Sequence, residues 1–358
     1  MSTAPRPPQL SVVATSRNDE HGGHLLARMQ LFIRGLAEQA ERFGLPVELI
    51  VVEWNPPADR PPLAEALDWQ AGDNFRPQVI SVPREVHRTF PNADELPLFQ
   101  MIGKNVGIRR STAPFVLATN IDILLSDELF KFLQTGLKAG AMYRVDRHDV
   151  LAELGGSELP TPDQCRALPV IREHRLDGLR YPNGAPPVAQ AHPRRERLGV
   201  KPALNELARL TGAAWDRLVL PKLHTSGCGD FTLASRETWF AMEGYPEWPI
   251  FSWHLDGVVL YQAYAGGVEM VNLEPPLVAY HLEHGEGSGW TPESRRLWDR
   301  LDAAGIPYLS TPAYRSLARK IVRGRGFHPV NGPDWGLAPL ELADTHPRPS
   351  TGGRSRHE

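Results

Sequence analysis

LSVVAT at residues 10–15 and VELIVVEW at residues 47–54 are the two stretches that decide the fold. Each is a short apolar run rich in β-branched residues, and each ends in polar or chain-breaking residues, as is typical of a strand buried on both faces. Residues 24–43 between them carry apolar side chains at helical spacing, and Gly44 and Pro46 end that pattern. A strand, a helix and a second strand in this order predict parallel pairing through a right-handed crossover.

The alternation of strands and helices continues through the first 145 residues. Residues 79–82 and 115–118 have the composition of further buried strands, and residues 98–110 and 129–137 show apolar residues at helical spacing. The pattern predicts an α/β fold with a doubly wound, mostly parallel, Rossmann-like sheet. In such sheets, ligands bind beyond the carboxyl ends of the strands.

The second half of the chain is less regular. Residues 151–221 are rich in Pro, Arg and Glu and show weak periodicity apart from a candidate helix near residues 202–210, so we expect an insertion or a lid there. Regular patterns return after residue 222, with helices expected at residues 236–244 and 253–266 and a strand at residues 268–273. Residues 278–284 then lead into a polar loop, and the sequence leaves open whether residues 281–284 end a strand or form a helical turn.

These patterns predict one large domain with two ends that lack structure. We expect a flexible N-terminus at residues 1–9 and a disordered tail at residues 346–358, because both are dominated by Pro, polar and small residues. The domain between them, residues 10–345, is expected to consist of a first half (residues 10–150), the insertion (residues 151–221) and a second half (residues 222–345).

The bulk composition excludes several classes of protein. The 358 residues carry a net charge of −3, which indicates no general affinity for nucleic acid. No apolar run reaches the roughly 18–20 residues of a transmembrane segment, and the N-terminus has no apolar stretch typical of a secretory signal. We expect a cytoplasmic protein with Cys165 and Cys228 as free thiols, and the sequence leaves peripheral contact with a membrane open. A P-loop, a GxGxxG motif and a GxSxG elbow are all absent from the sequence.

Asn120-Ile121-Asp122 follows the fourth predicted strand and is the sharpest chemical feature of the sequence. Strand alternation is expected to point Asn120 and Asp122 to the same side. A carboxylate and an amide oxygen so placed suit a divalent cation that in turn holds a diphosphate. The alternative is an Asn-x-Asp turn in which both side chains cap backbone amides, but the position after a buried strand favours the metal site. Lys104 and Asn105, on the helix before this strand, are candidates for contacts to phosphate and to a substrate hydroxyl.

The segments GKNVGI at residues 103–108 and FVLATNID at residues 115–122 resemble the helix and strand that carry the DxD-type motif of GT-A fold glycosyltransferases. The resemblance is to the inverting, family-two-like members, and it extends to SVVATSRND at residues 11–19 and to VVEW at residues 51–54. It implies an α/β GT-A fold and binding of a UDP- or GDP-sugar. The positions that it implies for donor binding are Thr15, Arg17, Asn18, Glu53, Lys104, Asn105 and Asn120, with Mn²⁺ or Mg²⁺ held by Asp122.

The same resemblance covers part of the second half of the chain, at residues 229–231, 244–247 and 254–256. It implies an acceptor loop followed by an acidic general base at the start of a helix. Asp256 matches that base, and Asp230 is the rival. Alternatively, Asp256 is an acidic residue that caps or stabilises the N-terminus of a helix and has no catalytic role. An inverting transfer needs one carboxylate to accept the proton of the acceptor hydroxyl.

His281 and His284 form the last cluster in the sequence. The resemblance implies a C-terminal histidine as the third metal ligand, and either residue could serve. The spacing does not match the His-Glu-x-x-His motif of zinc proteases.

The sequence therefore predicts an enzyme, a glycosyltransferase that moves a sugar from a nucleotide-diphosphate sugar to a hydroxyl acceptor of unknown identity. Two alternatives stay open. One is a catalytically silent GT-A module that binds a nucleotide sugar or a protein partner. The other is a sugar-phosphate nucleotidyltransferase, which would be expected to carry a Gly-rich, basic loop after the first strand.

Overall fold

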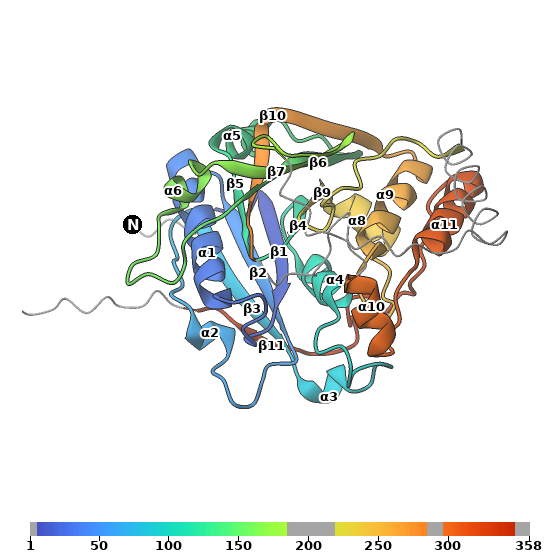
Figure 1. Cartoon of the computed structure of the whole chain (residues 1–358), viewed down its shortest axis with the longest axis horizontal. Coiled ribbons are helices and arrows are strands. Elements are labelled where there is room, and N and C mark those ends of the chain that lie inside the picture. The colour runs from blue at the N-terminus through green and yellow to red at the C-terminus, as the bar shows by residue number, and fades with distance from the viewer. Residues whose placement is uncertain (1–5, 185–218, 285–295, 348–358) are drawn as a thin grey trace, which may run out of the picture.

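The computed structural model describes residues 6–184, 219–284 and 296–347, and within them the strands form a single mixed sheet with helices on both faces (Figure 1). The strands are β1 (Leu10–Ser16), β2 (Val47–Trp54), β3 (Phe75–Val82), β4 (Phe115–Thr119), β5 (Ile123–Leu125), β6 (Ala141–Val150), β7 (Val170–Arg175), β8 (Gly178–Arg180), β9 (Phe231–Ser235), β10 (Glu269–Leu282) and β11 (Ala343–Thr345). The helices are α1 (Leu25–Phe43), α2 (Leu63–Ala66), α3 (Arg84–His87), α4 (Gln100–Arg110), α5 (Asp127–Thr135), α6 (Pro162–Arg166), α8 (Arg236–Met242), α9 (Leu255–Ala265), α10 (Arg296–Ala303) and α11 (Thr311–Gly324).

The first half of the sheet is parallel. Strands β3, β2, β1 and β4 lie side by side in that order, and each adjacent pair runs in the same direction. This arrangement confirms the predicted strand–helix–strand crossover. Because the four strands are parallel, the last residues of β1, β2 and β4 meet at one edge of the sheet.

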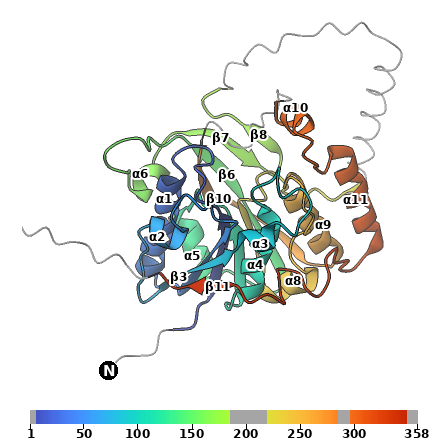
Figure 2. The same cartoon turned by 90° about the horizontal axis from the view of Figure 1, so that it is seen from below.

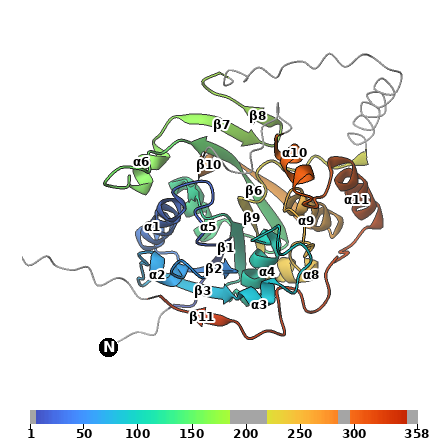
Figure 3. The same ribbon diagram turned by 60° about the horizontal axis from the view of Figure 1, so that its bottom comes forward.

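The second half of the sheet mixes directions. Strand β9 pairs antiparallel with β4 and β6, and β6 pairs parallel with β10, whose final residues pair antiparallel with β5. The β7–β8 hairpin extends β6, and β11 pairs antiparallel with β3 at the opposite edge (Figure 3). The longer ladders are parallel, so the predicted α/β class with a mostly parallel sheet is confirmed.

Both faces of the central strands are buried. Val12 and Ala14 of β1 pack in the core beneath α1 and α5, whereas Val13 packs in the core shared with α4, α8 and α9. Figures 1 and 2 show α1 on one side of the sheet and these three helices on the other. All seven residues of β1 are buried, which explains why the sequence shows a continuous apolar run instead of an alternation.

Several predicted boundaries were wrong. Residues 151–221 contain α6, β7 and β8, although the sequence indicates few regular elements there; the candidate helix near residues 202–210 lies outside the described residues. Strand β3 begins at Phe75, before the predicted start at Val79, because residues 75–78, including Pro77, also pair with β2. The strand expected at residues 268–273 continues through residue 282 as one strand, β10, whose register shifts between Leu273 and Val278 around the Pro275-Pro276 pair.

Two further expectations concern the thiols and the membrane. Cys165 and Cys228 are both free, as predicted, and the structure shows that both are buried. Among the described residues, no helix combines the length and the apolar character required to cross a bilayer. Most of the expected N-terminal and C-terminal flexible ends, residues 1–5 and 348–358, lie outside the described residues.

Candidate functional site

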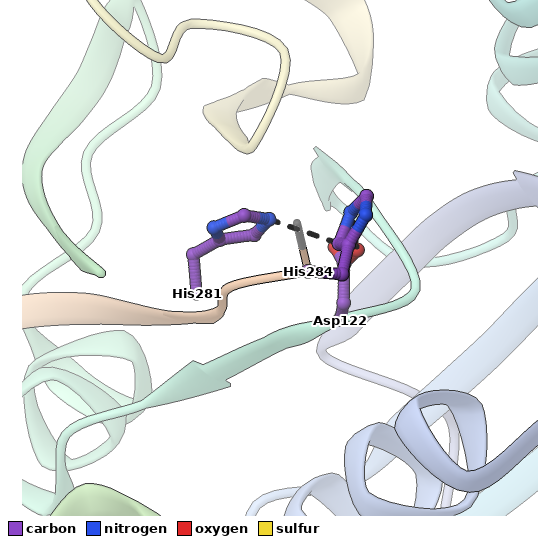
Figure 4. A group of neighbouring side chains, drawn as sticks. All are labelled: Asp122, His281 and His284. Atoms are coloured by element: carbon purple, nitrogen blue, oxygen red, sulfur yellow. Dashed lines mark ion pairs between the residues drawn. The ribbon is translucent and has the colours of Figure 1, made fainter. Parts of the chain in front are cut away.

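Three side chains of metal-binding type lie together at the carboxyl end of β4. Asp122, His281 and His284 each offer a ligand atom, and these atoms lie within 4.8 Å of one another (Figure 4). Nε2 of His284 is 3.4 Å from Oδ2 of Asp122, and Nε2 of His281 is 3.7 Å from the same oxygen. The structure thus brings together the three residues that the sequence analysis named for the metal.

Strand β10 explains why residues so far apart in the sequence meet. His281 lies opposite Ile123 of β5, and the backbone N–H of Leu282 donates to the carbonyl of Asp122 at 3.0 Å. His284 follows two residues after the end of β10. The antiparallel β5–β10 ladder therefore places both histidines beside the turn that carries Asp122.

The environment of Asp122 favours the ionised carboxylate, and one of its oxygens has no hydrogen-bond partner among the described residues. Burial opposes ionisation, but His281, His284 and Arg28 outweigh it and hold the pKa of Asp122 below its usual range. Oδ2 accepts from Nη1 of Arg28 at 2.7 Å, whereas buried Oδ1 has no hydrogen-bond partner among the described residues. Nδ1 of His284 is also buried and unpartnered there. An unpartnered carboxylate oxygen beside two imidazoles fits a divalent cation such as Mn²⁺.

Arg28 also belongs to the site, although it was not among the residues predicted from the sequence. Its guanidinium is 1% exposed, and besides Asp122 it donates to the backbone carbonyls of His21 and Gly23. A signal exists in the sequence, because Arg28 lies between Leu25 and Phe32 on the mostly apolar buried face of α1. A charged residue at such a position needs a buried partner.

The loop from His21 to Gly23 covers His284. A Cβ atom added to Gly22, whose φ is +72°, would overlap Nδ1 of His284 and would lie 3.0 Å from Nη2 of Arg28. The rings of His21 and His284 are 6.2 Å apart, edge to face. Glycine at position 22 therefore allows the loop after β1 to approach the cluster closely.

Asn120 has different partners from Asp122. Strand β4 ends at Thr119, so residues 120–122 form a turn and strand alternation does not apply, contrary to the expectation that both side chains point to the same side. Oδ1 of Asn120 accepts from Gln100 at 2.9 Å and from Nζ of Lys104 at 2.8 Å. Nδ2 donates to Asp230 at 2.5 Å. Asn120 thus links α4 to the loop before β9.

Lys104 is fully buried at the same junction. Its ammonium donates to Asn120 and, at 2.7 Å, to the carbonyl of Gly229. Burial lowers the pKa of Lys104 to about 8, although Asp230 and Asp256 oppose that shift. The side chain therefore places a positive charge between the two acidic residues named as candidate bases.

Asn105 holds a turn. Its amide donates to the carbonyl of Tyr245 and accepts from the N–H of the same residue, both at 2.8 Å, and also donates to Glu247 at 3.0 Å. The side chain is 0% exposed. Its observed partners all belong to the chain segment that follows α8.

The remaining donor-side candidates line the carboxyl ends of β1 and β2. Thr15 donates to the carbonyl of Val52 at 3.0 Å, and Nε of Arg17 donates to the carbonyl of Asn55 at 2.7 Å. Glu53 accepts from the backbone N–H of Leu63 at 2.9 Å. Burial raises the pKa of the Glu53 carboxyl, against the effect of that amide.

Asn18 has an unused acceptor in the same region. Its Nδ2 donates to the carbonyl of Pro61 at 2.9 Å, and its buried Oδ1 has no partner among the described residues. Together with Glu53, it provides polar groups at the edge where a doubly wound sheet binds ligands.

Asp256 and Asp230 lie in contrasting environments. Burial raises the pKa of Asp256 in the first turn of α9, although Cys228, Lys104 and the N–H of Gly257 favour the ionised form. Asp230 is also buried, but Arg147 at 2.5 Å and the charge of His281 lower its pKa overall. A base needs a pKa that allows it to take up a proton, so the environment of Asp256 suits proton transfer better.

The backbone approaches Asp256 closely. A Cβ atom added to Gly229 would lie 3.1 Å from Oδ2 of Asp256, and Oδ1 accepts from the N–H of Gly257 at 2.8 Å. Gly229 also accepts from Lys104. The loop before β9 therefore joins the Asp256 side of the site to the Asn120 side.

A second group of ligand-type side chains, Asp149, His281 and Glu283, lies next to the first. Asp149 is already paired with Nε of Arg147 at 2.9 Å and with Nε of Arg172 at 2.5 Å. Arg172 also pairs with Glu283 at 2.6 Å. The carboxylates of Asp149 and Glu283 already form ion pairs with arginines, which disfavours binding of a cation by these three side chains.

No protein-family model matches the chain, and no curated protein matches it in sequence. Solved structures do resemble it. The crystal structure of S. aureus TarS aligns over 78% of this chain with 14% identity and a TM-score of 0.40, and that of TarS residues 1–349 over 76% with 13% identity and a TM-score of 0.37. The catalytic domain of Drosophila β1,4-galactosyltransferase 7, in complex with xylobiose, aligns over 75% with 10% identity and a TM-score of 0.30.

These alignments cover only part of the other proteins. The chain spans 37% and 60% of the two TarS chains and 65% of the galactosyltransferase chain.

Proposed function

We propose that this protein transfers a sugar from a nucleotide-diphosphate sugar to an acceptor hydroxyl, with inversion at the anomeric carbon. The observation that carries the proposal is the cluster of Asp122, His281 and His284 at the carboxyl end of β4. The cluster lies where a doubly wound sheet binds ligands, and its donor set suits Mn²⁺ or Mg²⁺. Such an ion, when bound, offsets the negative charge of a departing diphosphate.

The loop after β1 supports binding of the donor. The guanidinium of Arg28 donates to the carbonyls of His21 and Gly23 and to the carboxylate of Asp122, so it connects the loop to the cluster. The unused acceptor of Asn18 and the carboxyl of Glu53 lie at the ends of β1 and β2. We assign the nucleotide of a UDP- or GDP-sugar to this edge, with its diphosphate toward Asp122.

The environment of Asp256 supports its assignment as general base. In the transfer, the acceptor oxygen forms a bond to the anomeric carbon as the bond from that carbon to the diphosphate oxygen breaks. The proton of the acceptor hydroxyl goes to a carboxylate. Asp256 has a raised pKa, and the Asp230 carboxylate is neutralised by Arg147. We therefore assign the proton to Asp256 and a positioning role to Asp230.

The experiment that tests the proposal is a donor-hydrolysis and transfer assay over a panel of UDP- and GDP-sugars with Mn²⁺. Asp122→Ala is expected to abolish turnover, because the cluster loses its only carboxylate. The fold survives, but with a lower melting temperature, because buried Arg28 loses its charged partner. Asp127→Ala is the matched control, since that carboxylate pairs with Arg42 and Gln39 instead of histidine. An Asp122→Ala protein with a normal rate would refute the proposal.

A further inference from the structure

Asp149 lies at the centre of a buried charged network beside the proposed metal site. It is 0% exposed and belongs to β6, which runs between β7 and β10 near this point. Its Cα partners are Arg172 on β7 and His281 on β10. The sheet register therefore places a carboxylate directly beside one of the three clustered side chains.

The carboxylate of Asp149 faces one specific nitrogen of His281. Oδ1 lies 3.2 Å from Nδ1 of the ring, and the other nitrogen, Nε2, faces Asp122 at 3.7 Å. Two arginines, Arg147 and Arg172, pair with Asp149, which favours the ionised carboxylate. An ionised carboxylate only accepts hydrogen bonds, so the facing nitrogen must carry a proton.

We propose that Asp149 is a positioning residue that keeps a proton on Nδ1 of His281, so that the ring, when it is neutral, adopts the tautomer protonated at Nδ1. Nε2 then keeps its lone pair and presents it toward Asp122 as a ligand. The role in metal binding rests on the proposed function, but the tautomer itself does not. Carboxylates that accept from the second ring nitrogen of a ligand histidine fix its orientation in this way.

The arginines make the effect of an amide substitution predictable. Oδ2 of Asp149 accepts from Nε of Arg172 at 2.5 Å and from Nη2 of Arg147 at 3.3 Å. Nε of Arg147 lies 2.9 Å from Oδ1 but makes no hydrogen bond among the described residues, so in Asp149→Asn the amide oxygen is expected at the Oδ2 position. The NH₂ group then faces Nδ1 of His281. Because that NH₂ group is a hydrogen-bond donor, Nδ1 of His281 must then be unprotonated. The ring proton moves to Nε2, and the N–H of Nε2 points toward Asp122.

The experiment reads the tautomer of His281 by ¹⁵N NMR on metal-free, histidine-labelled protein at alkaline pH, where imidazole is neutral. The His281 signals are assigned with His281→Gln. Wild-type protein is expected to show a protonated Nδ1 and an unprotonated Nε2, and Asp149→Asn the reverse. In parallel, the affinity for Mn²⁺ alone is expected to fall by about 10–100-fold in Asp149→Asn.

Asp146→Asn is the matched control. Asp146 is a buried carboxylate on the same strand, and it pairs with His224 at 3.0 Å and with Arg175 at 3.2 Å. Its substitution is expected to leave the tautomer of His281 and the Mn²⁺ affinity unchanged.

The proposal is overturned if wild-type His281 is protonated at Nε2, a result that needs no variant to fold. It is also overturned if folded Asp149→Asn keeps the wild-type tautomer. If wild-type protein binds no Mn²⁺ but shows the expected tautomer, the metal assignment of the proposed function fails while the positioning of His281 by Asp149 stands.

Discussion

Single residues decide how closely the loop after β1 approaches the histidines. A Cβ atom at Gly22 would overlap Nδ1 of His284. Gly23 has nearly the same φ, +73°, but a Cβ atom there would have no neighbour within 4 Å among the described residues. The two glycines therefore have the same backbone requirement but different neighbours. This difference allows strain and contact to be separated by experiment.

Gly22→Ala is expected to weaken Mn²⁺ binding, because the new methyl group displaces His284 and crowds Arg28. Gly23→Ala is the control, since both variants place alanine at positive φ, which costs about 1–2 kcal/mol. Both should lose similar stability in thermal unfolding, but only Gly22→Ala should lose Mn²⁺ affinity in calorimetry. Equal Mn²⁺ affinities in the two folded variants would show that the loop does not act on the cluster.

Asp256→Asn is expected to lower the transfer rate by about 10²–10⁴-fold, as for loss of a general base. Burial raises the pKa of Asp256, so the ionised carboxylate destabilises the folded state at neutral pH. The uncharged amide of Asp256→Asn should therefore leave the melting temperature unchanged or raise it. In wild-type protein, the rate should fall with decreasing pH through a midpoint above 3.8, the ordinary value for Asp.

Asp230→Asn provides the contrast. It removes a carboxylate that pairs with buried Arg147, so its main effect is expected to be a lower melting temperature. If Asp230→Asn abolished transfer without loss of stability while Asp256→Asn retained activity, the two roles would have to be exchanged.

The residues of the candidate cluster differ in how well the sequence predicts them. Asp122, His281 and His284 could be named from a strand end and from the resemblance, and the structure brings them together. Their binding of a metal stays a prediction. Arg28 and Asp149 were missed, because their roles depend on partners 94 and 132 residues away in the sequence.

At the scale of elements, a buried arginine makes several of the hydrogen bonds that hold the loop at residues 224–230. Arg144 on β6 is 1% exposed, and its guanidinium donates to the carbonyls of His224, Ser226 and Cys228. This loop carries Gly229 and Asp230, which contact Lys104 and Asn120. A buried cation on a neighbouring strand thus determines the shape of the candidate acceptor loop.

Arg144→Met is expected to loosen that loop, since each hydrogen bond from a buried charged group contributes about 1.5–3 kcal/mol. Amide hydrogen exchange should accelerate at residues 224–230, and KM for the acceptor should rise while nucleotide affinity is unchanged. Arg110→Met is the matched control, because Arg110 binds the carbonyls of Gly336, Leu337 and Leu340 in the C-terminal segment. Unchanged exchange at residues 224–230 in Arg144→Met would contradict the assignment.

The element that the sequence analysis missed most completely is β6. Its ten residues include Arg144, Asp146 and Asp149, all buried, so the local pattern is neither apolar nor alternating. Their charges are compensated by residues on β7, on β10 and in the loop before β9, which no local pattern reveals. Strand β1, by contrast, is apolar throughout and was predicted within one residue of its end.

At the scale of the whole molecule, the sheet joins a parallel half to a mixed half, with β4 at the junction. The strand–helix–strand pattern predicted the parallel half, because each crossover is local and right-handed. The pairing of β9 with both β4 and β6, and of β10 with β5, joins distant segments and was not predicted. That non-local pairing brings the histidines to Asp122, so the cluster depends on the complete sheet.

The central claim is that Asp122, His281 and His284 hold a divalent cation that binds the diphosphate of the donor. The most direct test is the thermal midpoint of wild-type protein and Asp122→Ala with UDP and GDP, each with and without Mn²⁺. Ligand at about 100 times its Kd stabilises the folded state by about 2.7 kcal/mol, which is readily measured. We predict that one nucleotide stabilises the wild-type protein only when Mn²⁺ is present, and that Asp122→Ala shows no such shift. Equal stabilisation with and without Mn²⁺, or an Asp122→Ala protein that responds as the wild type does, would contradict the claim.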